Sequence, residues 1–217
     1  MNIELQNVLS MMDIIGKFKN IRRKNFVGNS NPRRFENDAE HSYELTLLAW
    51  FLISKHKLNL NIDKVIKYAL VHDLVEVYAG DIDPYMYSNS SEMLKVKKIN
   101  EEIALKRLEL ELHDTPDLLN SLKEYEKMSD EESKFIYVLD KVACQFGIVY
   151  IDKRNMNDCG VSLATGENVK NTKMNKSKDL TILYDEVFQK WKQTPGFFAE
   201  KDYIPEYKKE FLQDFKK

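Results

Sequence analysis

The chain contains few cysteines, prolines and glycines, the residues that cross-link a fold or interrupt its helices and strands. Its 217 residues include two cysteines, five prolines and seven glycines, so we expect neither a disulfide framework nor a fold rich in tight turns. Cys144 and Cys159 lie outside any close-spaced metal or redox motif, which favours the reducing cytoplasm. The densest apolar run, residues 45–53, is too short to cross a bilayer, and residues 1–6 lack a basic region, so no membrane association is expected.

An excess of charge of one sign is also missing. The chain has 33 Lys and Arg against 35 Asp and Glu, with a formal net charge of −2. Without a basic field, binding to a nucleic-acid polymer is disfavoured. The lysine-rich stretch at residues 95–98 is followed by acidic residues, so it is interpreted as a solvated, ion-paired face, and a phosphate-binding patch is the less favoured alternative.

Apolar residues recur at helical spacing along most of the chain, whereas the alternation typical of strands is scarce. The stretches run through residues 3–15, 38–52, 62–79, 93–112, 130–152 and 180–191. We therefore predict an all-α fold, a compact helical bundle that forms a single domain over residues 1–217. The polar stretch 155–178 is expected to be a mobile excursion between helices, and residues 81–90 a candidate lid.

The pair His72-Asp73 lies on one of these apolar helical patterns and is followed by Glu76. At spacings of three and four residues, the three side chains project from adjacent positions of one helical turn. Gly80 suits the position after a helix end, where the backbone adopts a positive φ. Asp81 would then lie on the rim of the same site.

Two further residues have the chemistry of metal ligands. His41 is expected in the first turn of a helix that Asn37 or Asp38 can cap. Asp140 lies in an apolar helical stretch, where a buried carboxylate needs a cation, and an ion pair with Lys141 is the alternative. Each residue alone is ordinary, but two imidazoles and two carboxylates together suit a divalent first-row metal.

The ordered pattern of His41, then His72-Asp73, then Asp140 resembles that of the HD-domain metal-dependent phosphohydrolases. The resemblance covers about residues 10–150, which would form the catalytic core, and the helices of residues 176–217 are expected to pack on it. It implies an HD-domain helical bundle in which these four residues hold the metal.

Within that superfamily the chain is most similar to the 5′-deoxynucleotidase branch, on the evidence of Glu40-His41-Ser42 and of Glu76 followed by Gly80-Asp81. The resemblance implies an enzyme that removes the 5′-phosphate from deoxyribonucleoside 5′-monophosphates. It assigns Glu76 and Asp81 to catalysis.

The same branch has an arginine ahead of the first histidine, followed three residues later by an aromatic residue that is usually tryptophan. Arg23 with Phe26 fits this pattern, and the adjacent Arg22 stays an alternative. Arg23 and Asp81 are therefore the residues that the resemblance places on the substrate.

Only His113 lies between the His-Asp pair and Asp140, which indicates one divalent ion, whether Mn, Co, Mg, Zn, Fe or Ni. The resemblance also suggests a homodimer. Two other interpretations stay open: the same metal site acting on a phosphodiester, a nucleoside triphosphate or an alarmone, and a non-enzymatic helical regulator with structural ligands.

Overall fold

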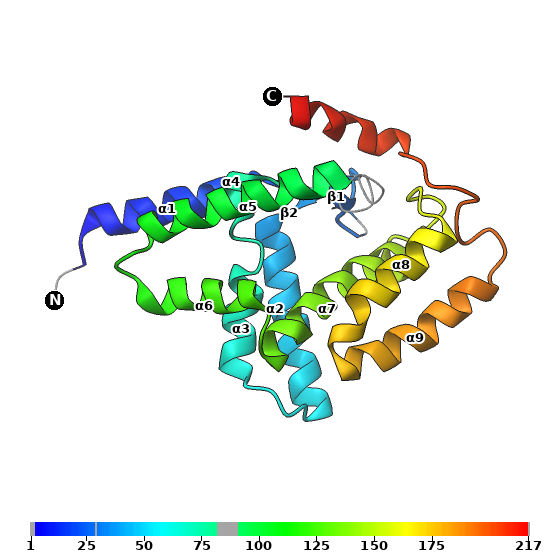
Figure 1. Cartoon of the computed structure of the whole chain (residues 1–217), viewed down its shortest axis with the longest axis horizontal. Coiled ribbons are helices and arrows are strands. Elements are labelled where there is room, and N and C mark those ends of the chain that lie inside the picture. The colour runs from blue at the N-terminus through cyan, green and yellow to red at the C-terminus, as the bar shows by residue number, and fades with distance from the viewer. Residues whose placement is uncertain (1–2, 29, 82–90, 217) are drawn as a thin grey trace. The chain divides into compact units, whose positions relative to one another are not determined.

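The computed structural model describes residues 3–28, 30–81 and 91–216, and the side chains at 91–93 and 212–216 are not considered. The candidate lid lies outside these residues except for Asp81. In the described part the fold is all-α apart from one two-stranded sheet, β1 (Arg22–Phe26) with β2 (Phe35–Asn37), which the sequence did not predict (Figure 1).

The chain divides into two compact units. Among the described residues, the first unit comprises 3–23, 35–81 and 91–136, and the second comprises 24–34 and 137–216. The first contains α1 (Leu5–Lys19), α2 (Asp38–His56), α3 (Ile62–Val71), α4 (Glu76–Ala79), α5 (Ser91–Glu111) and α6 (Pro116–Lys127). The continuous helix α7 (Glu131–Phe146) begins in the first unit and ends in the second. The second also contains the π-helix η1 (Gly147–Ile151), α8 (Leu163–Lys173), η2 (Met174–Lys176), α9 (Lys178–Gln193) and η3 (Glu206–Lys216).

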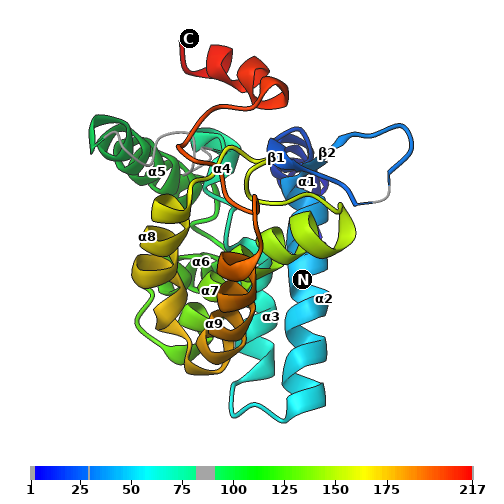
Figure 2. The ribbon, with the colours of Figure 1, turned by 90° about the vertical axis from the view of Figure 1, so that its right-hand side faces the viewer.

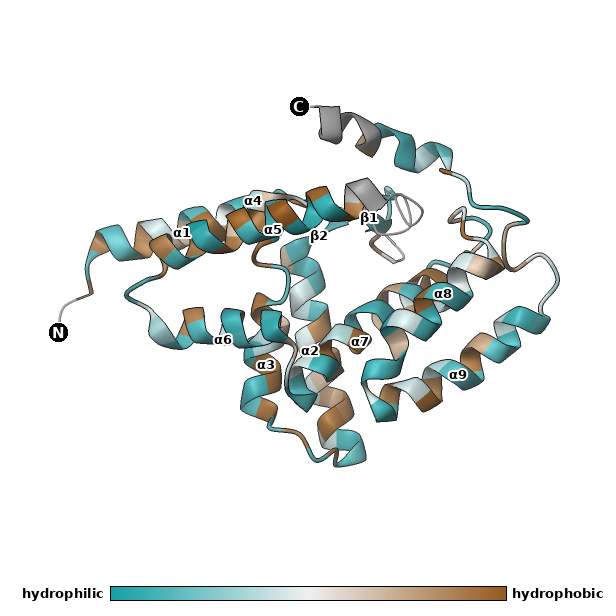
Figure 3. Ribbon diagram, in the orientation of Figure 1, coloured by the Kyte–Doolittle hydropathy of each residue, from teal (hydrophilic) through white to brown (hydrophobic). Residues whose placement is uncertain are grey.

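The core of the first unit forms where α1, α3, the turn after α3, α5 and α6 meet. Helix α2 packs along α3, and α3 packs on α6 (Figures 1 and 2). Apolar and polar residues are interspersed along these helices (Figure 3), and only some of the apolar side chains are buried in the core. The buried cluster consists of Ile14, Phe18, Val71, Leu74, Val75, Ala104, Leu108, Leu112 and Leu122.

A polar cluster fixes the start of α7 against α3 within the first unit. The Asp130 carboxylate accepts a hydrogen bond from the Ser133 backbone N–H at 2.8 Å, which caps the helix. It also accepts from the Tyr68 hydroxyl at 2.9 Å and lies 2.7 Å from the Lys64 ammonium. One carboxylate therefore serves as a helix cap and as a link between two helices.

The second unit has an aromatic core built around α9. Tyr184, Phe188 and Trp191 are buried one helical turn apart, and Phe197 stacks on Trp191 with 5.1 Å between ring centroids. Helix α8 lies in the polar stretch 155–178, so this stretch is not only a connection between helices. The mobility expected there stays a prediction. Ser162 caps α8, and its position is supported from a distance by Asp202.

Two expectations concern the whole chain, namely membrane-spanning helices and the number of domains. Within the described residues, no helix has the length and apolar character needed to span a membrane. The prediction of a single domain over residues 1–217 stays a prediction.

Candidate metal centre

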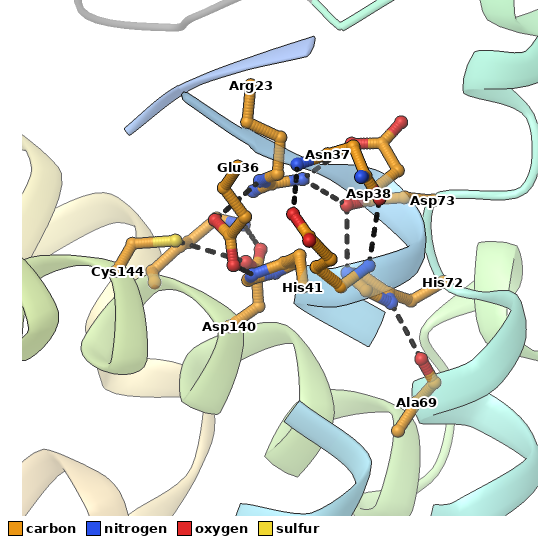
Figure 4. Close-up of polar contacts among 12 residues, drawn as sticks. Arg23, Glu36, Asn37, Asp38, His41, Ala69, His72, Asp73, Asp140 and Cys144 are labelled. Atoms are coloured by element: carbon orange, nitrogen blue, oxygen red, sulfur yellow. Dashed lines mark hydrogen bonds and ion pairs between the residues drawn. The ribbon is translucent and has the colours of Figure 1, made fainter. Parts of the chain in front are cut away.

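His41 is held at the start of α2 by a capping box. The Asn37 side chain accepts from the Glu40 N–H at 3.0 Å, and the Asn37 N–H donates to the Glu40 carboxylate at 3.2 Å. Of the two predicted caps, Asn37 is the one used. Asp38 is the first residue of the helix and is completely buried. This local structure points two side chains, those of Asp38 and His41, into the interior of the first unit (Figure 4).

The His-Asp pair lies in a tight turn and not in an uninterrupted helix, so the predicted helix over residues 62–79 is wrong in its middle. Helix α3 ends at Val71, and Leu74 N–H donates to Val71 O while Glu76 N–H donates to Asp73 O. These three-residue hydrogen bonds tighten the backbone between α3 and α4. As predicted, Gly80 ends the segment with a φ of 74°.

The imidazole of His72 has a defined tautomer. Its Nδ1 lies 2.9 Å from the Ala69 carbonyl oxygen, which can only accept, so Nδ1 carries the proton and Nε2 presents a lone pair. Nε2 is buried and has no hydrogen-bond partner among the described residues. It lies 2.9 Å from the Asp73 Oδ2 atom, without hydrogen-bond geometry.

Two electron-pair donors therefore face each other in the interior. Atoms that bind one ion at about 2.1 Å and at right angles lie about 3 Å apart. The separation of 2.9 Å between the His72 and Asp73 atoms fits a shared cation. The residues present thus fit a divalent metal by their chemistry and by their spacing.

His41 supplies a second imidazole to the same region. The rings of His41 and His72 have centroids 5.3 Å apart, and one nitrogen of each lies within 4.8 Å of the other. The Glu36 carboxylate lies 3.5 Å from His41 Nδ1, where it can orient the ring. Glu36 was not predicted from the sequence, because neither its burial nor the strand β2 that carries it was indicated there.

Asp140 lies in the second unit, on the continuous helix α7. Its carboxylate is buried and accepts from the Lys141 ammonium at 2.9 Å and from the Cys144 thiol at 3.7 Å. The contact with Lys141 is the structural alternative that the sequence left open. The role of Asp140 as a fourth ligand stays a prediction.

Arg23 reaches the site from β1. Its Nη1 atom donates to Asp73 at 2.6 Å and to Asp38 at 3.2 Å. Arg22 is exposed, and its guanidinium stacks on Phe35 instead. Because side chains alternate along a strand, only Arg23 points to the His-Asp turn. Phe26, proposed to accompany it, belongs to the second unit and packs there against Tyr207.

Three carboxylates lie close together beside Arg23. Asp38, Asp73 and Glu76 each place an oxygen within 4.8 Å of the others. Burial raises the pKa of Glu76 well above its usual value, and the charges of Asp73, Asp81 and Asp38 raise it further. Burial likewise raises the pKa of Asp38 to about 7, against the lowering effect of Arg23. The centre is acidic, and burial disfavours the ionised forms of Glu76 and Asp38.

The chain that forms this centre is similar in sequence to known proteins. Residues 15–181 match the sequence model of the HD domain. The chain is 32% identical to the 5′-deoxynucleotidase HDDC2 of Bos taurus over 138 residues, which cover 63% of each chain. It is 30% identical to the 5′-deoxynucleotidase YfbR of Escherichia coli O1:K1 / APEC over 112 residues, 49% of this chain and 56% of that one. The chain thus spans less than two thirds of the length of both relatives.

A solved structure shares the fold. The crystal structure of a predicted metal-dependent phosphohydrolase from Magnetospirillum magnetotacticum MS-1 superposes with a TM-score of 0.70. It is 23% identical in sequence, and the superposition covers 91% of this chain and all of that one.

Proposed function

Because the chain belongs to the HD domain family, we propose that it is a metal-dependent phosphohydrolase that removes the 5′-phosphate from deoxyribonucleoside 5′-monophosphates. The observation that carries this proposal is the pair of electron donors on the buried His72 and the partly buried Asp73, set beside Arg23 and Glu76. The names of the relatives support the choice of substrate.

One divalent ion would be held by His41, His72, Asp73 and Asp140. The first three lie in the first unit, and Asp140 is proposed from its burial and from its place in the family pattern. When bound, such an ion neutralises phosphate oxygens and lowers the pKa of a water molecule. Nitrogen and carboxylate ligands accept Mn, Co, Mg, Zn, Fe or Ni, so the ion present in the cell follows from supply as much as from geometry.

Arg23 binds the phosphate. Its guanidinium is held at the edge of the site by Asp38 and Asp73, and its side chain is 11% exposed, so little conformational freedom is lost when the substrate arrives. A guanidinium presents parallel N–H donors that match two oxygens of a phosphate group. In this role it orients the phosphorus atom for in-line attack.

Glu76 accepts the proton of the attacking water. Its Oε2 atom is buried and makes no hydrogen bond to the described residues, so it is available to a water molecule between the carboxyl and the phosphate. The water oxygen bonds to phosphorus, and the bond from phosphorus to the sugar O5′ breaks. The water proton goes to Glu76, and the departing O5′ takes a proton from Asp81 or from solvent. The raised pKa of this carboxyl, caused first by burial, favours its keeping that proton.

Asp81 has one of two roles. It follows Gly80 at the rim, and its charge acts on both Glu76 and Asp38, so it lies near the reacting groups. It either accepts a hydrogen bond from a sugar hydroxyl or passes a proton to the departing O5′. An Asp81→Asn variant separates these roles, because an amide still accepts a hydrogen bond but relays no proton.

The protein is proposed to act in the cytoplasm as a homodimer. Both cysteines are free thiols, which suits a reducing compartment. Helix α2 exposes Tyr43, Leu47, Trp50 and Phe51, each more than half accessible, and apolar side chains at this spacing form a face that a second copy can cover. Light scattering of the purified protein tests this state: a monomer mass would contradict it.

A phosphate-release screen tests the activity. Metal-stripped protein is reconstituted with one divalent ion at a time and assayed against deoxyribonucleoside and ribonucleoside 5′-monophosphates. Orthophosphate released from deoxynucleotides, and from ribonucleotides more slowly, is expected. Release of pyrophosphate or triphosphate from other nucleotides would indicate a different class of substrate. Absence of phosphate release with every ion would contradict the proposal.

A further inference from the structure

Lys97 lies on the face of α5 that points to the His-Asp turn. Ala104 and Leu108, seven and eleven residues further along, are buried in the same core cluster as Leu74 and Val75, so this side of α5 faces the core beside the turn. Lys97 belongs to the same side, two turns closer to the N-terminus of the helix. Its side chain is 27% exposed, whereas that of Lys98 is 78% exposed.

The surroundings of Lys97 are acidic. Its ammonium lies 3.4 Å from the Glu101 carboxylate, one turn along the helix. Burial lowers the pKa of Lys97, but the charges of Glu101, Glu76, Asp81 and Asp73 outweigh burial and raise it. Three of these four carboxylates belong to the centre described above, so the ammonium is charged at neutral pH. Helix α5, which carries Lys97, packs on α4, which begins at Glu76.

The charge balance of the site needs such a cation. In the first unit, Glu36, Asp38, Asp73, Glu76 and Asp81 gather around the proposed reacting position. A phosphate monoester is itself a dianion, and in a partly buried site like charges repel it strongly. The positive charges of one arginine and one divalent ion balance only part of the negative charge of these carboxylates and the phosphate.

We propose that Lys97 is a second phosphate-binding cation, which approaches the substrate phosphate from α5 while Arg23 approaches it from β1. Glu101 is the positioning residue that directs the ammonium to the site through the 3.4 Å contact. The inference rests on the proposed phosphohydrolase function. Lys97 and Lys98 both pair with a glutamate one turn along, as the interpretation of residues 95–98 as an ion-paired face predicts, but Lys97 is the less exposed of the two.

The test compares two neighbouring lysines. Lys97→Met keeps the aliphatic stem and removes the charge, Lys98→Met is the matched control, and Lys97→Arg restores a cation. Calorimetry measures binding of inorganic phosphate to the Mn-loaded proteins. We expect Lys97→Met to weaken phosphate binding by about ten- to a hundredfold, Lys98→Met to bind as the wild type does, and Lys97→Arg to recover most of the affinity. With deoxynucleotides, the Lys97→Met change should raise KM more than it lowers kcat, at an unchanged Tm.

The outcomes separate this inference from the proposed function. Phosphate binding that is equal in the wild type and in Lys97→Met, or absent from the wild type, overturns the role of Lys97 whatever the enzyme hydrolyses. Binding that depends on Lys97, in a protein that releases no phosphate from any deoxynucleotide, supports the anion site and overturns the 5′-deoxynucleotidase activity.

Discussion

Replacing Glu76 with glutamine should stabilise the metal-free protein and inactivate the enzyme. The Glu76 carboxyl is 7% exposed, its Oε2 atom has no hydrogen-bond partner among the described residues, and the charges of Asp73, Asp81 and Asp38 all disfavour its ionised form. An amide of the same shape carries no charge, and its N–H groups can donate to neighbouring carboxylates. The folded wild-type protein is therefore expected to be less stable than the Glu76→Gln variant.

The size of this effect follows from the surroundings. Relieving one buried, unsatisfied polar group contributes about 1–3 kcal/mol, and each kcal/mol raises the Tm of a chain of this length by about 2–4 °C. Because the folded-state pKa of Glu76 is raised above its unfolded value, wild-type stability falls as pH rises through that interval. The gain from Glu76→Gln should accordingly be larger at pH 8 than at pH 5.

Thermal unfolding of the metal-stripped protein measures the gain in stability of Glu76→Gln. Phosphate release after the metal is restored measures its loss of activity. We expect activity to fall by about 10²- to 10⁴-fold, the range for a lost general base. Glu102→Gln is the control, because Glu102 is 60% exposed, and its free energy of unfolding should stay within about 0.5 kcal/mol of the wild-type value. A lower Tm for Glu76→Gln, or more than a tenth of the activity retained, would refute the reasoning.

Three further predictions concern other parts of the molecule. Arg23→Lys, which replaces a forked donor by a point charge, should lower kcat/KM by about ten- to a hundredfold, and steady-state kinetics would contradict this by showing an unchanged value. Burial raises the pKa of Asp130, but hydrogen bonds, first that from Lys64, hold this pKa below its usual value. The contribution of Asp130 to stability is therefore present above about pH 4 and lost in acid. Asp130→Asn should lower the free energy of unfolding, measured with denaturant, by about 1–2 kcal/mol at pH 7 and by less at pH 3. Gly160 has a φ of 73°, and a Cβ there would overlap the Tyr203 carbonyl, so Gly160→Ala should cost more than about 2 kcal/mol, and an unchanged Tm would contradict it.

The helices could be predicted from the sequence where one face is apolar and long. The periodic stretches correspond to α1, α2, α3, α5, α7 and α9. Helix α8 was missed because its sequence is mostly polar, and its start is fixed by Ser162 and by Asp202, forty residues further along. The interruption after α3 was missed because an apolar period of three to four residues does not distinguish an α-helix from a tighter turn.

The candidate site was predictable to the extent that its chemistry is local. His72, Asp73 and Glu76 are neighbours in sequence, and the structure brings His41 to them. Asp38 was considered only as a helix cap, because a polar residue at a helix start is usually exposed. Its complete burial follows from Arg23, which arrives from a strand that the sequence pattern did not indicate.

A crystal soaked with Mn²⁺ or Co²⁺ tests the central proposal most directly, because anomalous scattering locates the ion without reference to activity. We expect one strong peak about 2.0–2.2 Å from a nitrogen of His41, from His72 Nε2 and from oxygens of Asp73 and Asp140. A peak elsewhere, or none at saturating metal with the His72 nitrogen still bare, would contradict it.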